Sequence, residues 1–256
     1  MTELARLTWT EADEALRSAR LALLPVGSLE QHGPHLTLDT DIAIAETLAR
    51  RLAGDLGSEA VLCPPIGYGL SEHHMGFPGT LTLRPATFIG MFGDLVESLA
   101  TWGMKRVLVV NGHGGNIDAL RLVSRNARRD HGTLLAAIMW AQLAATEIAA
   151  RAHSPQYGHA CEIETSVAMS LVPDRVYADR IQSLGSRRSA DELTDPPNST
   201  VDQAVWTNEW TDDGALGDPT KASLELGDEV VAIAYERALS FARRFARRSL
   251  GEGEQR

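Results

Sequence analysis

The sequence contains little cysteine and no long apolar run. Its two cysteines, Cys63 and Cys161, lie far apart and form no CxxC pair, so the sequence predicts no disulfide framework. No stretch approaches the roughly 20 apolar residues that span a bilayer, and the N-terminus lacks the basic region and apolar run of a signal peptide. We therefore expect a cytoplasmic protein that does not enter a membrane.

Basic charge is also scarce. The chain has 24 lysines and arginines against 34 aspartates and glutamates, a net charge of -10. Binding of nucleic-acid phosphates requires a basic face, and none is evident, so we expect no nucleic-acid partner. The length of 256 residues, with 44% hydrophobic residues, favours one large α/β domain over two small ones. We expect this domain to cover residues 1–250, followed by a disordered polar tail at 251–256.

Short apolar runs and helical patterns alternate along the chain. Residues 21–26, 60–63, 106–110 and 133–139 have the length and composition of buried strands. Helices are predicted over 42–52, 87–102, 117–128, 142–151, 162–171 and 222–247, with an irregular excursion from 173 to 217. Strands that alternate with amphipathic helices imply parallel pairing and right-handed crossovers. The predicted fold is a three-layer α/β/α sandwich around a mainly parallel sheet.

The first group of candidate ligands follows the first predicted strand. Glu30 and His32 are two residues apart, which places both on one side of an extended segment. Asp41 lies near the start of the next helix. Carboxylate and imidazole groups are the usual ligands of Zn²⁺, Mn²⁺ and Fe²⁺. The alternative is a polar loop whose aspartates cap the helix, which the sequence favours for Asp39 but not for the other three residues together.

A second group, Asn111–Asn116, reads Asn-Gly-His-Gly-Gly-Asn and follows the third predicted strand. Ligands of parallel sheets gather at the carboxyl ends of strands, so this motif and the first one are expected to converge. Glycines on both sides of His113 leave its imidazole unobstructed. Alone, the motif is also typical of a phosphate-binding turn or of a tight connection between strand and helix. Together with the first group, it favours His113 as a metal ligand.

The third group lies within His159–Ser166. If a helix begins near His159, then His159 and Glu162 share a face. Glu164 is two steps of about 100° beyond Glu162 and would point elsewhere, to brace the scaffold. If the segment is extended instead, both glutamates reach the same side. The remaining alternative is a helix with two exposed glutamates.

A fourth segment, Tyr68–Thr80, is dense in glycine and polar residues. Loops held on a rigid sheet often carry specificity, so Ser71 and His74 are candidate substrate-binding residues. His73 and His74 are adjacent and cannot both face one site in an extended chain, so one of them is expected at the surface. Four further candidate substrate-binding residues are Gly114, Gly115, Asn116 and Trp140.

These motifs resemble those of the creatininase family of metal-dependent amide hydrolases. The resemblance rests on Ser28–His35 with Thr40-Asp41, on Ser71–Thr80, Asn111–Asn116 and His159–Ser166, and on Gly217-Asp218-Pro219 before the last helix. It implies two divalent metal ions (Zn, Mn or Fe) per subunit and a homohexamer built as a trimer of dimers. It also implies that Glu30 and His113 hold one metal, that His32 holds the other, that Asp41 bridges them and that His159 is the catalytic general acid/base.

One departure from the family concerns the last ligand. Family members that hydrolyse creatinine carry a glutamate two residues after the histidine of the second motif, where this chain has Gly115. They lack a glutamate three residues after the catalytic histidine, where this chain has Glu162. We therefore expect Glu162, rather than Glu164, to complete the second metal site, and a substrate other than creatinine.

The resulting prediction is a hydrolase that cleaves a C–N bond of a small amide, cyclic amide or formamide. A water activated between the two metals would attack, and His159 would move the proton. A creatininase-family peptidase or a hydrolase of cyclic sugar ketones is the alternative within the family. From a different class, a phosphate- or sugar-binding module would explain the glycine turn but would hold no metal.

Overall fold

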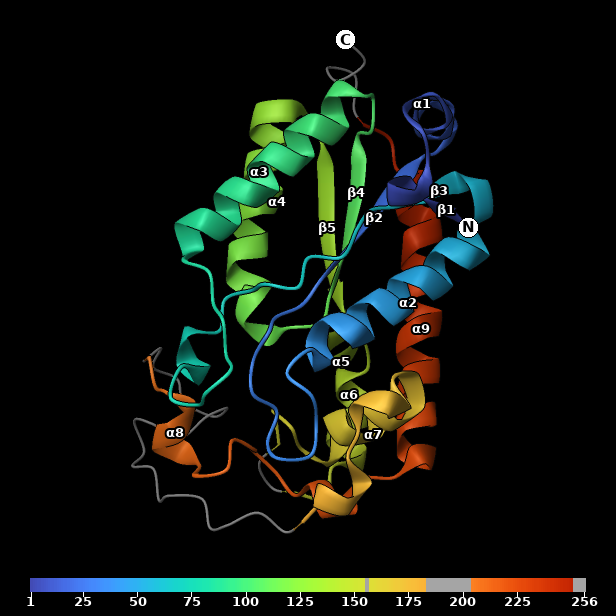
Figure 1. Cartoon of the computed structure of the whole chain (residues 1–256). Coiled ribbons are helices and arrows are strands. Elements are labelled where there is room, and N and C mark those ends of the chain that lie inside the picture. Colours follow the sequence, from blue (N-terminus) through green and yellow to red (C-terminus); the bar gives the residue numbers. More distant parts are fainter. Residues whose placement is uncertain (155–156, 183–203, 251–256) are drawn as a thin grey trace.

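The structure is a computed structural model that describes residues 1–154, 157–182 and 204–250. The tail predicted at 251–256 lies outside the described residues. Figure 1 shows a central sheet with helices on both faces. All strand pairs are parallel, in the order β1 (Thr2–Glu3), β3 (Ala60–Leu62), β2 (Leu21–Val26), β4 (Arg106–Asn111) and β5 (Leu134–Met139).

The strands are apolar because helices cover both faces of the sheet. Every residue of β2 is buried, and its side chains alternate between two core clusters. Leu21 and Leu23 pack into one cluster, and Ala22 and Leu24 pack into the other. This alternation is the side-chain period of two that a strand imposes.

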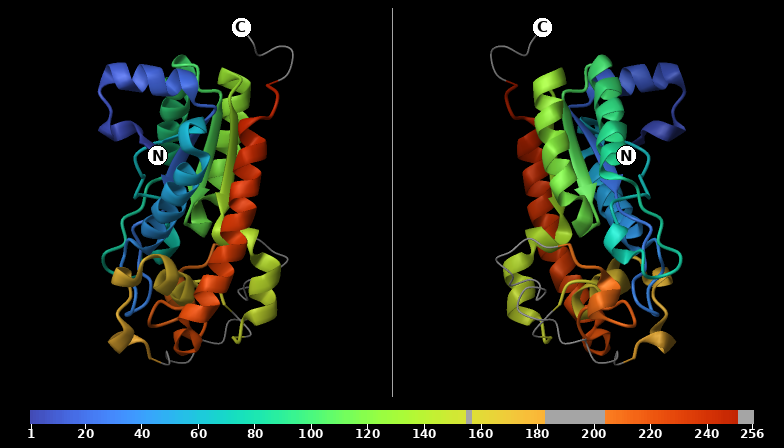
Figure 2. Two further views of the ribbon diagram at one scale, coloured as in Figure 1. Left: turned by 90° about the vertical axis from the view of Figure 1, so that its right-hand side faces the viewer. Right: turned by 90° about the vertical axis from the view of Figure 1, so that its left-hand side faces the viewer.

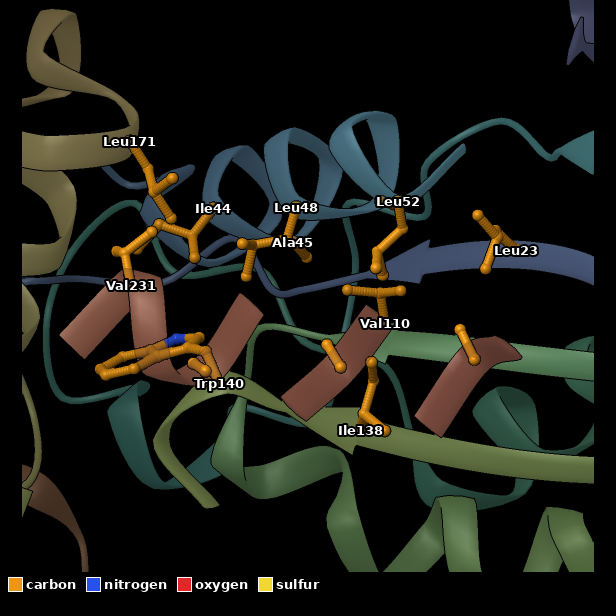
Figure 3. Packing of buried hydrophobic residues seen from close by; sticks show 14 of the residues in the cluster. Leu23, Ile44, Ala45, Leu48, Leu52, Val110, Ile138, Trp140, Leu171 and Val231 are labelled. Atoms are coloured by element: carbon orange, nitrogen blue, oxygen red, sulfur yellow. The ribbon is translucent and has the colours of Figure 1, made fainter. Parts of the chain in front are cut away.

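One face of the sheet is covered by α2 (Thr40–Leu56), α7 (Glu162–Leu171) and α9 (Leu224–Ala246). Figure 3 shows Ile44, Leu48 and Leu52 of α2 packed toward Leu23 and Val110 of the strands. The opposite face is covered by α3 (Pro85–Thr101) and α4 (Ile117–His131), with α1 (Trp9–Ser18) at its edge. The predicted three-layer sandwich is therefore confirmed.

The strands end at the end of the molecule where the later helices gather (Figure 2). There, α5 (Trp140–Leu143) follows β5 directly and α6 (Ala145–Arg151) follows α5. The short helix α8 (Thr207–Trp210) belongs to the excursion that the sequence predicts after residue 173. Within the described residues, no helix is both long enough and apolar enough to cross a membrane.

The predicted strands and helices agree with the observed ones to within a few residues, with four differences, one of which is α8 in the segment predicted to be irregular. The helix expected over 142–151 is divided into α5 and α6. Neither β1 nor α1 is predicted. α1 buries no residue fully, although Trp9, Ala12 and Leu16 have helical spacing and Leu16 packs partly buried against the core. Its start also carries a capping box formed by Thr8 and Glu11.

Candidate metal centre

Four predicted ligands come together at the carboxyl ends of β2 and β4. Glu30 and His32 lie in the loop after β2, Asp41 lies in the first turn of α2, and His113 follows β4. All four side chains are buried. His113 Nδ1 lies 3.2 Å from Glu30 Oε2 and 3.1 Å from Asp41 Oδ2, and His32 Nε2 lies 3.2 Å from Asp41 Oδ1.

The ligand atoms form overlapping groups around Asp41. One group contains Glu30, Asp41 and His113, and a second contains His32, Asp41 and Glu164. Within each group the possible ligand atoms lie within 4.8 Å of one another. Glu30, His32 and His159 form a third such group. The Asp41 carboxylate belongs to two of these three-residue groups. A carboxylate in that position could bridge two metal ions.

The backbone fixes which ring nitrogen of each histidine faces the carboxylates. His32 Nδ1 donates to the carbonyl oxygen of Glu30 at 3.1 Å, and His113 Nε2 donates to that of Leu70 at 2.9 Å. His159 Nε2 donates to the carbonyl oxygen of Gln31 at 2.7 Å. Because a carbonyl oxygen can only accept, the proton of each neutral ring lies on that nitrogen. The other nitrogen presents a lone pair to the cluster, as metal-binding histidines do.

The carboxylates retain unused acceptor capacity. Among the described residues, Glu30 Oε1 and Asp41 Oδ2 are buried and accept no well-aligned hydrogen bond. The other oxygen of Glu30 accepts a short hydrogen bond from Ser71 Oγ. Buried carboxylate oxygens without donors are costly unless a cation pairs with them. The residues present therefore fit a divalent metal centre.

Charge is strongly coupled within the cluster. Burial opposes the charged form of His32, but Asp41 and Glu164 beside it outweigh burial and raise its pKa to about 10. Burial also opposes the charge on Glu30, yet His113 outweighs it and the pKa of Glu30 falls to about 2. Burial raises the pKa of Glu164 to about 7. These opposed shifts show that the buried carboxylates attract positive charge, which metal ions would supply.

The structure places Glu164, not Glu162, beside the cluster. Glu164 Oε2 lies 3.9 Å from His32 Nε2 and 3.9 Å from His159 Nδ1. Glu162 instead accepts hydrogen bonds from the backbone of His153 and Ser154 at 3.1 and 2.8 Å, and from Ser154 Oγ. The expectation that Glu162 faces the cluster is thus corrected.

The physical reason for this correction is where α7 begins. The helix starts at Glu162, and His159 lies before it in an extended segment that pairs with Leu216. Glu164 is the third residue of the helix and accepts a hydrogen bond from the backbone of Ala160 at 2.6 Å. The sequence gives no capping-box signal for this helix start, because the N-cap position is Cys161 rather than serine or threonine, so Glu164 could not be located in that way.

His159 borders the cluster from the side of α7. Its Nδ1 lies 3.7 Å from Glu30 Oε1, and its ring lies 4.4 Å from that of His32, centroid to centroid. Burial and the neighbouring His32 lower the pKa of His159 to about 3. Its Nδ1 therefore faces the site as an unprotonated base.

A cavity of about 280 Å³ opens onto the cluster. Of the candidate substrate-binding residues, His74, Gly114 and Gly115 line it. The cavity is also lined by residues that the sequence interpretation did not place in the site, among them His73, Glu164, Thr207 and Trp210. His73 is stacked on His113, with ring centroids 5.7 Å apart, so both adjacent histidines lie near the site. Their backbone is a 3-10 turn rather than an extended segment.

Three other candidate residues lie outside that cavity lining. Ser71 contacts Glu30 from behind, and Asn116 Oδ1 accepts from the backbone of Leu70 at 3.0 Å. Trp140, the first residue of α5, is buried in the core beside α9 (Figure 3). Asp39 precedes α2 without capping it, since its side chain pairs with Arg175 at 3.0 Å.

Comparisons with known proteins place the chain in a family. The family model for creatininase, described as creatinine amidohydrolase, matches residues 5–242. A mycofactocin precursor peptide peptidase from Mycolicibacterium smegmatis is 35% identical over 219 residues, which cover 83% of this chain and 80% of that relative. The creatinine amidohydrolase of Pseudomonas putida is 29% identical over 194 residues, which cover 68% and 74%.

Solved structures match over nearly the whole chain. A structure of the creatinine amidohydrolase type from Bacteroides fragilis has a TM-score of 0.83 and 25% identity, and the match covers 98% of both chains. Solved creatininases that cover 95% of this chain include a Zn-Zn form and a manganese form. The family match and the shared fold lead to one conclusion: this chain belongs to the creatininase family of hydrolases.

Proposed function

We propose that this chain is an amidohydrolase with two divalent metal ions, which cleaves a C–N bond in a short peptide or peptide-derived amide. The observation that carries the proposal is the position of Asp41, which belongs to two groups of ligand atoms. Glu30 and His113 would complete one metal site. His32 and Glu164 would complete the other.

The metals would lower the pKa of a shared water and polarise the carbonyl of the amide. His159 supplies the proton transfer: its Nε2 is held by the carbonyl oxygen of Gln31, so its Nδ1 is free to accept a proton at the cluster. The same nitrogen would then return the proton to the leaving nitrogen of the substrate.

Two observations support a peptide-type amide. The chain is 35% identical to a precursor peptide peptidase over 83% of its length. The cavity of about 280 Å³ is at the lower limit of pockets that hold small ligands, so it suits one end of a short peptide. The glutamate of creatinine-hydrolysing members is absent at Gly115, where an added Cβ would lie 2.3 Å from the carbonyl oxygen of Leu70. This argues against creatinine as the substrate.

The experiment combines metal analysis with a substrate panel. Purified protein loaded with Zn²⁺ or Mn²⁺ should contain about two ions per chain and should hydrolyse at least one member of a panel of short peptides, formamides and lactams. Asp41→Asn is the matched control, because it keeps the shape of the residue that both groups share while removing its charge. Turnover that survives complete removal of metal would contradict the proposal. A protein that retains no metal but binds phosphate or sugar would support the non-catalytic alternative.

We further propose that residues 1–250 act as one domain in the cytoplasm and assemble as a homohexamer. The two core clusters on opposite faces of one sheet support a single domain. Cys63 and Cys161 are free and buried, which fits a reducing compartment.

An apolar cavity of about 650 Å³ beside the exposed Trp9 and Trp102 offers a surface that assembly could cover. Analytical ultracentrifugation of the full chain tests the hexamer, and a monomer would contradict it.

A further inference from the structure

His74 differs from the other histidines around the cluster. It is buried at the end of a 3-10 turn, Glu72–His74, and it lines the same cavity as Glu30 and His159. Its ring centroid lies 4.3 Å from that of His159. The partner of its Nδ1 is a side chain rather than a backbone carbonyl, so its tautomer must be derived separately.

That partner is the side-chain amide of Gln31, whose orientation is fixed at two points. Its Oε1 accepts a hydrogen bond from the backbone of Gly33 at 2.9 Å, and its Nε2 donates to the carbonyl oxygen of Gly214 at 2.9 Å. Rotation of the amide by 180° would place two donors together at Gly33 and two acceptors together at Gly214. The hydrogen-bond network therefore assigns Nε2 as the nitrogen that faces His74.

The second hydrogen of Gln31 Nε2 points to His74 Nδ1, at 2.9 Å. An amide nitrogen cannot accept a hydrogen bond, so His74 Nδ1 must accept and carries no proton. The hydroxyl of Thr207 lies 3.0 Å from the same nitrogen and can donate to it as well. The proton of the neutral His74 ring is therefore on Nε2, which lies 3.4 Å from Glu30 Oε1.

His74 thus presents an N–H group where His32, His113 and His159 present lone pairs. A protonated ring nitrogen cannot bind a metal, but it can donate to an oxygen atom. We propose that His74 is a substrate-binding residue whose Nε2–H binds the carbonyl oxygen of the scissile amide as negative charge develops there, and that Gln31 is the positioning residue that holds it in this tautomer. The inference rests on the proposed function for the identity of that oxygen.

Binding of an anion to the zinc-loaded full chain tests the donor. Methylphosphonate is the probe, because its tetrahedral oxygens resemble those of the amide after attack by water, and calorimetry measures its affinity. His74→Ala should weaken binding about tenfold or more, the usual effect of removing a hydrogen bond to a charged group. His74→Gln should recover much of the affinity, because its amide can place an N–H near the same point. The zinc content should stay that of the wild type in both variants.

Three results would overturn the proposal. Equal affinity in the wild type and His74→Ala would remove the donor role, and so would failure of the zinc-loaded wild type to bind the probe. Loss of zinc from His74→Ala would show instead that the ring holds Glu30 in place. Failure of the wild type to retain zinc at all would count against the proposed function itself, so the two failures are distinguishable.

The role of Gln31 has a spectroscopic test. Long-range proton–nitrogen NMR spectra of zinc-loaded protein labelled with ¹⁵N-histidine report which nitrogen of each ring carries the proton. The wild type should show His74 protonated at Nε2. Gln31→Glu should move that proton to Nδ1, because a carboxylate accepts and cannot donate, whereas Gln182→Glu at the exposed Gln182 should leave it in place. A wild-type His74 protonated at Nδ1 would refute the inference without any substrate.

Discussion

At the scale of single residues, the roles of four histidines near the cluster follow from the hydrogen-bond partner of one ring nitrogen. His32, His113 and His159 donate to backbone carbonyls and so present lone pairs. His74 accepts from Gln31 and so presents a proton. A backbone carbonyl as partner makes a histidine a metal ligand or a base at the cluster. An amide N–H as partner makes it a hydrogen-bond donor there.

The two glutamates of α7 should have separable effects. Glu164→Gln removes a charge that lies beside His32 and Asp41, so we expect the protein to lose about one of two metal ions and most of its activity. Glu162→Gln should keep both metals, because the carboxylate of Glu162 binds the backbone of His153 and Ser154. Its effect should be on stability, by about 1–3 kcal/mol, since it loses hydrogen bonds to a buried charged group. Metal analysis and thermal unfolding of the two variants check this.

One pattern of metal loss would contradict this assignment of the second metal ligand. If the second metal disappears from Glu162→Gln and persists in Glu164→Gln, the ligand assignment from the structure is wrong. Circular dichroism of both variants shows whether a loss of metal reflects a loss of folding.

Replacement of His159 should affect catalysis more than metal binding. Its Nδ1 is 3.7 Å from Glu30 and 3.9 Å from Glu164, and each proposed metal site keeps three other ligands without it. We expect His159→Ala to retain about two metals and to lose about 10²- to 10⁴-fold in kcat, the usual contribution of a general acid/base. Metal content and kcat measured on one preparation decide the matter. Loss of metal in proportion to activity would make His159 a ligand.

At the scale of secondary-structure elements, the start of α7 shows where the sequence interpretation fails. The apolar residues of the segment correctly predict a helix over 162–171, but the site prediction assumes a start at His159. That shift of three residues turns Glu162 toward the cluster and Glu164 away from it. Ala160, with a φ of 48°, lies in the left-handed region, and no apolar periodicity signals such a residue. Helix boundaries depend on local hydrogen bonds such as that from Ala160 to Glu164.

The strands and long helices are predictable because they depend on the pattern of apolar residues and not on single local hydrogen bonds. β2 is buried along its whole length, and the helix–strand alternation around it fixes the parallel topology. Glu30, His32, Asp41 and His113 could be predicted because each lies within a few residues of such an element's end. Thr207 and Trp210 could not, because they approach the cavity from an irregular segment whose path depends on tertiary contacts. Nothing local in the sequence ties α8 to His74.

The contact between α7 and α9 leads to a further prediction. An added Cβ at Gly227 in α9 would lie 1.9 Å from the carbonyl oxygen of Ser166 in α7. Gly227→Ala should therefore force the helices apart and destabilise the protein by about 1–3 kcal/mol, the usual effect of overpacking. The matched control is Gly54→Ala in α2, where an added Cβ meets nothing within 4 Å, and where alanine should be neutral or stabilising by up to about 1 kcal/mol.

Urea unfolding of both variants gives the comparison. Equal stability of Gly227→Ala and the wild type would show that the two helices adjust without cost.

At the scale of the whole molecule, metal and folding should be linked. The ligands come from the loop after β2, the first turn of α2, the turn after β4 and the start of α7, so metal ions would join segments that are distant in sequence. Free metal at 100 times its Kd stabilises a folded protein by about 2.7 kcal/mol, which corresponds to roughly 5 to 10 °C in Tm for a chain of this size. Removal of metal by a chelator should lower Tm by that amount.

Differential scanning calorimetry with and without chelator measures the shift. Asp41→Asn should show little change on chelation, because the shared ligand is already neutral. A wild-type Tm that does not respond to chelator would argue against metal bound in the folded state.

The carbonyl oxygens that orient the three lone-pair histidines belong to the main chain at Glu30, Gln31 and Leu70. Replacement of a side chain does not remove a carbonyl, so the hydrogen bonds that orient these three rings do not depend on which side chains stand at positions 30, 31 and 70. Selection can therefore alter cavity-lining residues that have no proposed role in metal binding or proton transfer, such as Met139, Trp210 and Leu216, while the orientation of the histidines is inherited unchanged. For the protein engineer, these residues are the part to diversify, and the backbone of the loops after β2 and at residue 70 is the part to preserve.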